Sequence, residues 1–553
     1  MFLGLIQIFK SFSKKELLTF LASFFILLVS FSLFFVEFIE SKTKITPVVG
    51  GQYTEGIVGQ PSFINPILAI SDADRDISEI IFDDLSDFAE SYKADQNGKI
   101  WHYRLKENLK WHDGEKITSD DIIFTIETIQ NPDVYSPLAQ NWQGVVATRV
   151  SEMEVEFRLP SQYAFFGAIL KDLNPIPKHI FAKIPAVNLR LSNYNFEPVG
   201  SGPYKFEAFH KKSDGYIDLY SFRRNENYFG HKAYLEKFNF AFFDRDEEMI
   251  KSFNSGDIDG MGVSNYRDIS KVFFPNKIFS LGENKYYAVF LNSYTHLAFK
   301  DRNVRMALNL STNKDGIVEK IFGKDASPID GPLVGESLEI DNNVFSGEFS
   351  IEKANQILEK SGWILNEENV RSKKIGKDDI KLEFVLTAPD VQFLKETAEL
   401  IKEDWQKIGV KADIKIISLA DINSQIIKTR DYQALVFGNI LGEVPDLFSF
   451  WHSSEKFYPG LNLALYENKE VDRLIKSVRS DFDFESRKKN LWKIQSLIIS
   501  DQPAIFLYSP NYLHINKKTL FGFDKRESQY ISFQSERLKN VENWYIKTAR
   551  VFK

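Results

Sequence analysis

The chain of 553 residues has no cysteine. This absence excludes disulfide bonds, thiolate metal sites, a cysteine nucleophile and a lipid-modified cysteine as a membrane attachment. A surplus of positive charge is missing as well, because 76 acidic residues outnumber 69 basic ones and leave a formal net charge of -7. Without basic residues to neutralise phosphates, we expect no nucleic-acid partner.

Long apolar runs are scarce too, and only one is long enough to cross a membrane. Residues 17–36 form 20 consecutive positions without a charge, and a helix of that length rises about 30 Å, the thickness of the hydrocarbon core. Basic residues precede this run and acidic residues follow it, namely Lys10, Lys14 and Lys15, then Glu37 and Glu40. The positive-inside rule therefore leaves the N-terminus in the cytoplasm and sends the rest of the chain outward.

The competing interpretation of this run is a cleavable signal peptide. Such peptides have an apolar core of about 7–15 residues and a small-residue cleavage site, whereas bulky and charged residues follow Val36. We therefore expect a single-pass anchor in the cell membrane. Residues 1–16 would lie in the cytoplasm, 17–39 would cross the membrane, and 40–50 would tether an extracytoplasmic part.

Beyond the tether, strand and helix patterns alternate without a repeat, which predicts a mixed α/β fold of two or more packed units. Alternating bulky and polar residues predict strands at 100–105 and 155–159. Between them, Thr118 with Asp121 is typical of a capping box at the start of a helix. Apolar residues at helical spacing predict further helices at 301–308, 354–358, 393–408, 471–478 and 486–499.

No residue pattern indicates a catalytic, metal or cofactor site. His112-Asp113-Gly114 fits a turn, because Asp and Gly tolerate tight-turn geometry and no partner nucleophile is visible. Gly200-Ser201-Gly202 lacks the lysine of a phosphate-binding loop, and Pro203 would interrupt a helix that began there. The other histidines show no metal-ligand spacing. Arg305 lies on an otherwise apolar helix face, where we expect it to pair with an acidic neighbour.

Several motifs follow one another along the chain in a fixed order. They are Trp101-His102-Tyr103-Arg104-Leu105 leading through Leu109-Lys110-Trp111-His112-Asp113-Gly114 to Asp120-Asp121-Ile122, then Gly200-Ser201-Gly202-Pro203-Tyr204, then Phe290-Leu291-Asn292 with Phe299-Lys300-Asp301 and Val304-Arg305-Met306-Ala307-Leu308, and finally a run through Tyr466, Asp472, Arg487, Gln495 and Pro503. In this order they resemble the solute-binding protein family 5, whose members carry dipeptides, oligopeptides or nickel chelates. The resemblance covers nearly all of residues 50–525.

This resemblance implies a two-lobed, periplasmic-binding-protein-like fold of type II, similar to the large cluster C proteins, that closes on a solute by hinge motion. Lobe I would comprise residues 51–288 and 505–553, with an extra subdomain at about 70–198, and lobe II would comprise 289–504. The chain would cross between lobes at 287–291 and 504–508. The implied function is a non-enzymatic receptor that delivers short peptides to the permease and ATPase subunits of an ABC importer.

The resemblance also implies where the solute is held. The candidate ligand-binding residues are Asn65, Pro66, Tyr204, Asn292, Glu443, Asp446 and Trp451. In peptide-binding relatives, an aspartate in the region that corresponds to residues 437–451 holds the peptide's amino terminus. In this chain, the expected position of that aspartate falls near Leu441. Glu443 or Asp446 would then take its place. Four alternatives stay open: a non-peptide solute such as a glycoside or metal chelate, a membrane-tethered sensor, a tethered hydrolase and, last, a membrane-anchored scaffold without a ligand.

Overall fold

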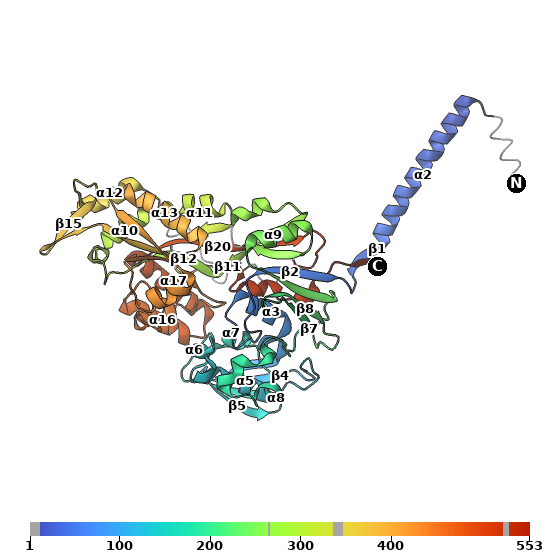
Figure 1. Ribbon diagram of the computed structural model, residues 1–553, viewed down its shortest axis with the longest axis horizontal. Coiled ribbons are helices and arrows are strands. Elements are labelled where there is room, and N and C mark those ends of the chain that lie inside the picture. Colours follow the sequence, from blue (N-terminus) through green and yellow to red (C-terminus); the bar gives the residue numbers. More distant parts are fainter. Residues whose placement is uncertain (1–11, 264–265, 336–346, 524–529) are drawn as a thin grey trace.

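Two α/β lobes lie side by side, with a smaller subdomain below them and one long helix leading away from the body (Figure 1). The computed structural model describes residues 12–263, 266–335, 347–523 and 530–553. The first eleven residues of the expected cytoplasmic segment, and residues 524–529 of the expected lobe I, lie outside this description. The mixed α/β, two-lobed architecture is the one that the sequence predicts.

One β-sheet runs through both lobes because its longest strand, β20 (Ala504–Lys517), belongs to both. The lobe II strands are β12 (Lys285–Leu291), β13 (Ala326–Pro328), β17 (Glu383–Pro389), β18 (Lys411–Ile417) and β19 (Ala434–Ile440). The lobe I strands are β2 (Gln52–Val58), β7 (Tyr204–Lys211), β8 (Ile217–Arg224), β9 (Lys237–Phe243), β10 (Gly260–Val263), β11 (Asn276–Glu283) and β21 (Tyr530–Ile531). We use "lobe I" and "lobe II" for these two strand sets and the helices packed on them.

The chain changes lobe between β11 and β12 and again in the middle of β20. The first half of β20 pairs with β12, from Phe290↔Ala504 to Tyr287↔Tyr508, and the second half pairs with β11, from Gly282↔Asn511 onward. The predicted crossings at 287–291 and 504–508 therefore lie in two strands that pair with each other inside lobe II. The lobe boundaries given from the sequence stay a prediction.

Lobe II has a helical layer on each face of its sheet, and each layer encloses an apolar core. One layer contains α10 (Arg302–Leu310), α11 (Lys314–Phe322), α12 (Ile351–Lys360) and α13 (Gln392–Gln406). The other contains α15 (Phe448–Trp451), α16 (Lys469–Ser480) and α17 (Phe484–Asp501). A small outer sheet joins β14 (Ile364–Leu365), β15 (Arg371–Ile375) and β16 (Asp378–Lys381).

Local sequence signals account for the ends of these helices. The Asp301 side chain caps α10 by accepting a hydrogen bond from the backbone N–H of Asn303 at 2.9 Å. Gly362 and Gly409, after α12 and α13, have φ angles of +82° and +76°, which favour glycine. The five helices predicted in this half of the chain are all present, with bounds that differ by a few residues.

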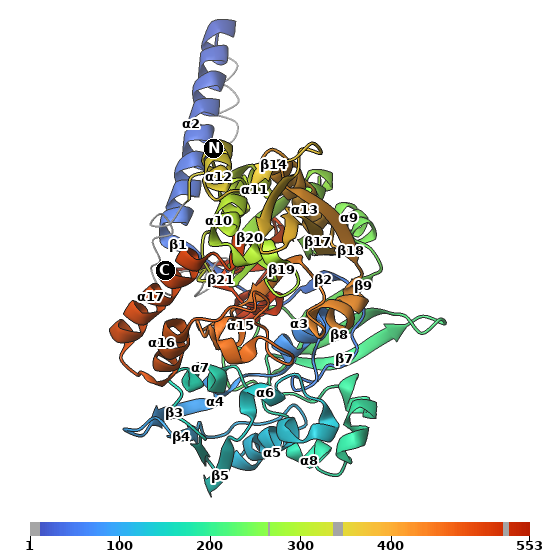
Figure 2. The same ribbon diagram turned by 90° about the vertical axis from the view of Figure 1, so that its left-hand side faces the viewer.

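Lobe I and the subdomain share one hydrophobic core. Lobe I adds α3 (Asp72–Ile81), α9 (Asp246–Ser255), and the short helices η4 (Tyr266–Lys271) and η9 (Gln534–Leu538). The subdomain has a four-stranded sheet of β3 (Ala89–Ala94), β4 (Ile100–Leu105), β6 (Glu154–Arg158) and β5 (Val146–Ser151), with α4 (Leu85–Phe88), α5 (Ser119–Gln130), α6 (Ala139–Trp142), α7 (Phe166–Lys171) and α8 (Lys178–Phe181). Figure 2 shows this subdomain beneath both lobes.

The two subdomain strands and the capping box predicted from the sequence are confirmed. The first strand has the predicted bounds, and the second differs by one residue at each end. Asp121 Oδ2 accepts a hydrogen bond from the backbone N–H of Thr118 at 2.8 Å, which fixes the start of α5.

The long helix α2 (Lys14–Lys42) contains the predicted apolar run, and none of its residues is buried in the body. It leads directly into β1 (Thr43–Pro47), which pairs antiparallel with β22 (Thr548–Phe552) at the C-terminus. The segment that the sequence assigns to a tether therefore contains a paired strand.

Candidate functional site

The loop after β19, residues 441–447, reaches from lobe II to both other parts of the molecule. Glu443 Oε1 lies 3.4 Å from Nζ of Lys539 in the C-terminal part of lobe I. Asp446 Oδ2 accepts a hydrogen bond from the Tyr163 hydroxyl of the subdomain at 2.8 Å. Gly442, with a φ angle of +73°, and Pro445 shape the turn that carries both carboxylates. The loop thus joins three parts of the chain at one place.

Asp446 is the centre of a polar and aromatic cluster, which we call the latch: Tyr163, Asp446, Phe448 and Arg479. Arg479 Nε lies 3.1 Å from Asp446 Oδ2. Its guanidinium stands over the rings of Tyr163 and Phe448, 4.8 Å and 4.4 Å from their centroids. The carbonyl of Arg479 also accepts a hydrogen bond from the backbone N–H of Ala164 at 2.6 Å. Burial, helped by Asp446, raises the pKa of Tyr163 above its ordinary value, so this hydroxyl stays a donor.

Glu443 belongs to a second cluster, in which one ammonium group meets several carboxyl groups. Burial opposes the charge of Lys539, but Glu79, Glu536, Glu443 and Asp172 together raise its pKa above the ordinary value. Burial raises the pKa of Glu79 to about 8 and, with Glu443 as the next cause, that of Asp172 to about 7. Carboxyl groups outnumber the ammonium here, and a second cation that entered the cluster would favour their charged forms.

A further set of cross-lobe contacts lies on the other face of the lobe II sheet, beside α13. Arg267 Nη2 in η4 lies 2.7 Å from Glu396 Oε2 in α13. A cavity of about 250 Å³ lies between these elements. The two lobes therefore touch on both sides of the shared sheet.

Two predicted site residues in lobe I have buried side chains with protein partners. Asn65 is 1% exposed, and its amide donates to Asn195 Oδ1 at 3.2 Å. Tyr204 is 0% exposed, and its hydroxyl donates to the carbonyl of Leu235 at 3.4 Å. Pro66 is partly exposed. In this conformation, Asn65 and Tyr204 offer no free polar atom to a solute.

The same is true of two predicted residues in lobe II. The amide of Asn292 donates to the carbonyl of Arg430 at 3.1 Å. The indole N–H of Trp451, which is 0% exposed, donates to the Tyr286 hydroxyl at 3.1 Å. The structure brings only Glu443 and Asp446 together, and the assignment of the seven residues to a binding site stays a prediction.

His112 links the two turns that the sequence analysis distinguishes from catalytic motifs. Its Nε2 lies 3.0 Å from the carbonyl oxygen of Gly202, and its Nδ1 accepts from the N–H of Gly200 at 3.2 Å. Burial lowers the pKa of His112 to about 3, so the ring stays neutral. A Cβ on Gly200 would lie 2.0 Å from the carbonyl oxygen of Ile81, which explains the glycine. These contacts are structural.

Among the described residues, Arg305 does not pair with an acidic side chain, contrary to the expectation from the sequence. Its guanidinium donates to the backbone carbonyls of Asp501 and Gln502 and to that of Phe299, at 2.7 to 3.2 Å, rather than to an acidic side chain. The carbonyls at the end of α17 lack helical partners, which makes them acceptors for a cation. The role is structural, but the partner expected from the sequence is wrong.

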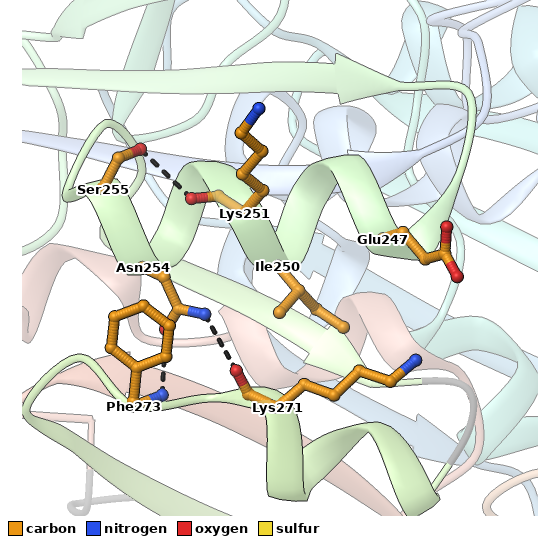
Figure 3. A pocket seen from close by; sticks show the side chains of 7 residues that line it. All are labelled: Glu247, Ile250, Lys251, Asn254, Ser255, Lys271 and Phe273. Carbon is orange, nitrogen blue, oxygen red and sulfur yellow. Dashed lines mark hydrogen bonds between the residues drawn. The ribbon is translucent and has the colours of Figure 1, made fainter.

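A pocket of about 430 Å³ lies on α9 of lobe I (Figure 3). Asn254 at its end donates to the carbonyl of Lys271 at 2.9 Å and accepts from the N–H of Phe273 at 2.9 Å. None of the predicted site residues lines it. Across the described part of the chain, no group of three or more His, Asp or Glu side chains is placed to hold a metal ion.

Sequence reasoning missed Tyr163, Asp172, Arg479 and Lys539. None of them belongs to a motif, and they come from segments that are far apart along the chain. The structure alone shows that they meet the 441–447 loop. The candidate site is therefore a junction of lobe I, lobe II and the subdomain around Glu443 and Asp446.

Known proteins resemble this chain over most of its length. A family model described as bacterial extracellular solute-binding proteins, family 5 (middle), matches residues 86–457. The oligopeptide-binding protein AppA of Bacillus subtilis is 27% identical over 526 residues, which cover 91% of this chain and 93% of AppA. The structure of AppA in complex with a nonapeptide superposes with a TM-score of 0.71 and 26% identity, over 91% of this chain and 100% of AppA.

Two further solved structures share the fold. The ABC transporter substrate-binding protein CtaP of Listeria monocytogenes has a TM-score of 0.78 at 24% identity, over 90% of this chain and 99% of CtaP. NikZ of Campylobacter jejuni, solved with Ni(L-His), has a TM-score of 0.73 at 22% identity, over 89% of this chain and 99% of NikZ.

Proposed function

The chain belongs to the bacterial extracellular solute-binding proteins of family 5, and from this premise we propose that it captures short peptides between its lobes for an ABC importer. A permease in the same membrane would accept the peptide, and an ATPase subunit would drive its transport. Members of this family are solute-binding receptors, and we assign no catalytic role to any residue. Full-length similarity to AppA, an oligopeptide-binding protein, favours a peptide as the solute.

The observation that carries the proposal is the reach of the 441–447 loop. From lobe II it contacts lobe I through Glu443 and the subdomain through Asp446. A solute bound beside this loop would be enclosed by all three parts, as a receptor that closes by hinge motion requires.

Glu443 is the better candidate for holding a peptide's amino group. Asp446 is already engaged by Tyr163, Arg479 and the backbone N–H of Phe448. The Glu443 side chain is 38% exposed and forms an ion pair with Lys539 at 3.4 Å, in a cluster that has more carboxyl groups than ammonium groups. An amino terminus placed there would gain a charge partner with little rearrangement.

A second candidate function is favoured by Leu441. This residue is 8% exposed and apolar, and it lies near the position where the resemblance places the amine-binding aspartate. A solute without an amino group, such as a metal chelate or a glycoside, would not need that aspartate. NikZ, solved with Ni(L-His), shares the fold with this chain.

We also propose that α2 remains as a membrane anchor. Its 29 residues include the charge-free run and are entirely outside the core, as a membrane-spanning helix requires. Extraction of native membranes with alkaline carbonate tests this, because an anchored chain stays in the pellet. A mature N-terminus beyond residue 40 would contradict it.

The experiment for peptide recognition compares a free and an Nα-acetylated form of the same peptide by calorimetric titration. Using the full chain in lipid nanodiscs, we expect the free amine to bind at least about tenfold more tightly, equivalent to roughly 1.4 kcal/mol. Glu443→Gln should remove this preference. Glu467→Gln is a matched control, because Glu467 is an exposed lobe II carboxylate paired with Lys456 at 2.6 Å. Equal affinity for both peptides in the native chain would reject Glu443 as the amine partner.

A further inference from the structure

The outer end of α2 passes into the body without a flexible linker. Thr43 is both the C-cap of the helix and the first residue of β1. Its register partner in β22 is Phe552, and the N–H of Lys553 donates to the carbonyl of Lys42 at 2.9 Å. The C-terminus therefore lies at the base of the helix, as Figure 1 and Figure 2 both show.

This two-stranded ribbon, β1 with β22, continues into lobe I through backbone hydrogen bonds. The N–H of Val48 donates to the carbonyl of Lys547 at 3.0 Å, and the N–H of Gly50 donates to that of Tyr234 at 2.8 Å. A linker of this kind has little freedom to extend. The position of lobe I is therefore coupled to the position of α2.

The length of α2 places the ribbon at the membrane surface. The charge-free run ends at Val36, and the six residues from Glu37 to Lys42 rise about 9 Å along a helix. The polar headgroup layer on each side of the hydrocarbon core is about 5–7 Å thick. If the run fills the core, Thr43 and Phe552 lie at the outer edge of the headgroup layer, and the usual tilt of a membrane-spanning helix brings them closer to the phosphates.

The ribbon has the chemistry of a headgroup contact. Five basic side chains gather at it and are exposed, namely Lys42, Lys44, Lys547, Arg550 and Lys553. Exposed apolar side chains stand among them: Phe552 is 81% exposed, Ile45 is 60% exposed and Val551 is 39% exposed. Basic groups bind anionic phosphates, and apolar groups enter the boundary between headgroups and acyl chains.

Acidic groups near the ribbon are fewer. Glu40 pairs with Arg550 at 3.3 Å, and Glu37 adds one further negative charge. Basic charges still exceed acidic ones. An isolated two-stranded ribbon is also marginally stable in water, so a surface that covers it would stabilise it.

We propose that the β1–β22 ribbon is a membrane-contact site that binds anionic phospholipid headgroups of the outer leaflet and holds lobe I close to the bilayer. The proposal rests on the proposed anchor, because α2 brings the ribbon to that level. Among the described residues, the ribbon joins α2 to lobe I, so solute-driven closure would move lobe II toward a lobe I that stays in place beside the permease.

The absence of native cysteine allows a clean test with single-cysteine spin labels. Full-length Phe552→Cys and Ile45→Cys variants are labelled and reconstituted in vesicles of phosphatidylcholine with or without phosphatidylglycerol. We expect both labels to lose most of their collisions with a water-soluble nickel chelate and to keep collisions with oxygen. The matched control is Phe273→Cys, since Phe273 is 79% exposed on lobe I and lines the pocket on α9, outside the ribbon.

A second experiment removes basic charge from the ribbon. Replacing Lys44, Lys547 and Lys553 together by Gln should expose the label at position 552 again in vesicles that contain phosphatidylglycerol. Replacing three exposed lysines elsewhere, Lys110, Lys183 and Lys212, should leave it protected. Carbonate extraction of the same vesicles reports the anchor separately. A label at 552 as accessible as that at 273, in a chain that carbonate does not extract, would overturn the membrane contact while leaving the anchor intact.

Discussion

Lobe I and lobe II neutralise their buried arginines in different ways. In lobe I, Arg537 is 1% exposed and lies between two buried carboxylates, 2.9 Å from Glu55 Oε1 and 2.6 Å from Asp76 Oδ2. In lobe II, Arg371 is also 1% exposed, but it donates to the backbone carbonyls of Ile408 and Trp363 at 2.9 and 2.7 Å, and the carboxylate that it pairs with, Glu359 at 3.1 Å, has a side chain that is 64% exposed.

Arg430 repeats the lobe II pattern by donating to the carbonyls of Lys456 and Gly460 at 2.9 and 2.6 Å. Carbonyls do not titrate, whereas carboxylates do. The difference teaches that the buried arginine of lobe I depends on buried, titratable carboxylates from distant segments, whereas the buried arginines of lobe II depend mainly on backbone carbonyls.

The largest effect that separates the lobes is expected from Arg537→Met. It leaves Glu55 and Asp76 buried without a cation, which costs about 3–5 kcal/mol of unfolding free energy. Arg371→Met leaves carbonyls with lost partners and should cost less, about 1–3 kcal/mol. Urea unfolding of both variants checks the ranking. An equal loss of unfolding free energy in the two variants, or a larger loss in Arg371→Met, would contradict this difference between the lobes.

A second difference is expected in the response to pH. Burial raises the pKa of Asp83 in lobe I to about 8, and one of its oxygens already accepts from the Tyr228 hydroxyl at 2.6 Å. This folded-state pKa is above the unfolded value of about 3.9. The stability that Asp83 contributes is therefore complete below about pH 3.9 and is lost as pH rises through about 8. Melting curves of Asp83→Asn should therefore depend less on pH between about 4 and 8 than those of the native chain.

The control for this prediction is Glu467→Gln, an exposed lobe II change that should keep the native pH dependence. An unchanged slope in Asp83→Asn would show that Asp83 does not carry the pH dependence of lobe I.

The smallest effect is expected where lobe II meets the subdomain, at the latch. Tyr163→Phe removes the hydroxyl that donates to Asp446 and should weaken closure by about 1.5–3 kcal/mol at most, because the bond is to a charged group. Distances between spin labels on lobe II and the subdomain would report a larger open population without solute. Tyr194→Phe, on an exposed subdomain residue, is the matched control. An unchanged distance distribution would exclude the latch as a determinant of closure.

The sequence predicts most of the local structure because local signals determine it. The strand at 100–105, the Thr118–Asp121 capping box and the glycine stops after α12 and α13 each depend on residues close together in the chain. The two-lobed fold follows from the order of motifs, which resembles a known family.

Long-range contacts could not be predicted in this way. The pairing of Thr43 with Phe552 joins the two ends of the chain, and the Arg537 cluster joins three distant segments. Local pattern contains no information on which strands or side chains meet across such distances. For the same reason, Glu443 and Asp446 could be named from the sequence, but their partners Lys539 and Tyr163 could not.

The most direct test of the account is a thermal-shift measurement of the full chain in nanodiscs with pooled peptides of two to nine residues, compared with pooled sugars and metal chelates. A ligand present at about 100 times its dissociation constant stabilises a protein by ~2.7 kcal/mol, which is readily detected. A peptide receptor should show a rise in melting temperature with peptides alone. A rise only with chelates or sugars, or no rise with any pool, would contradict a peptide receptor.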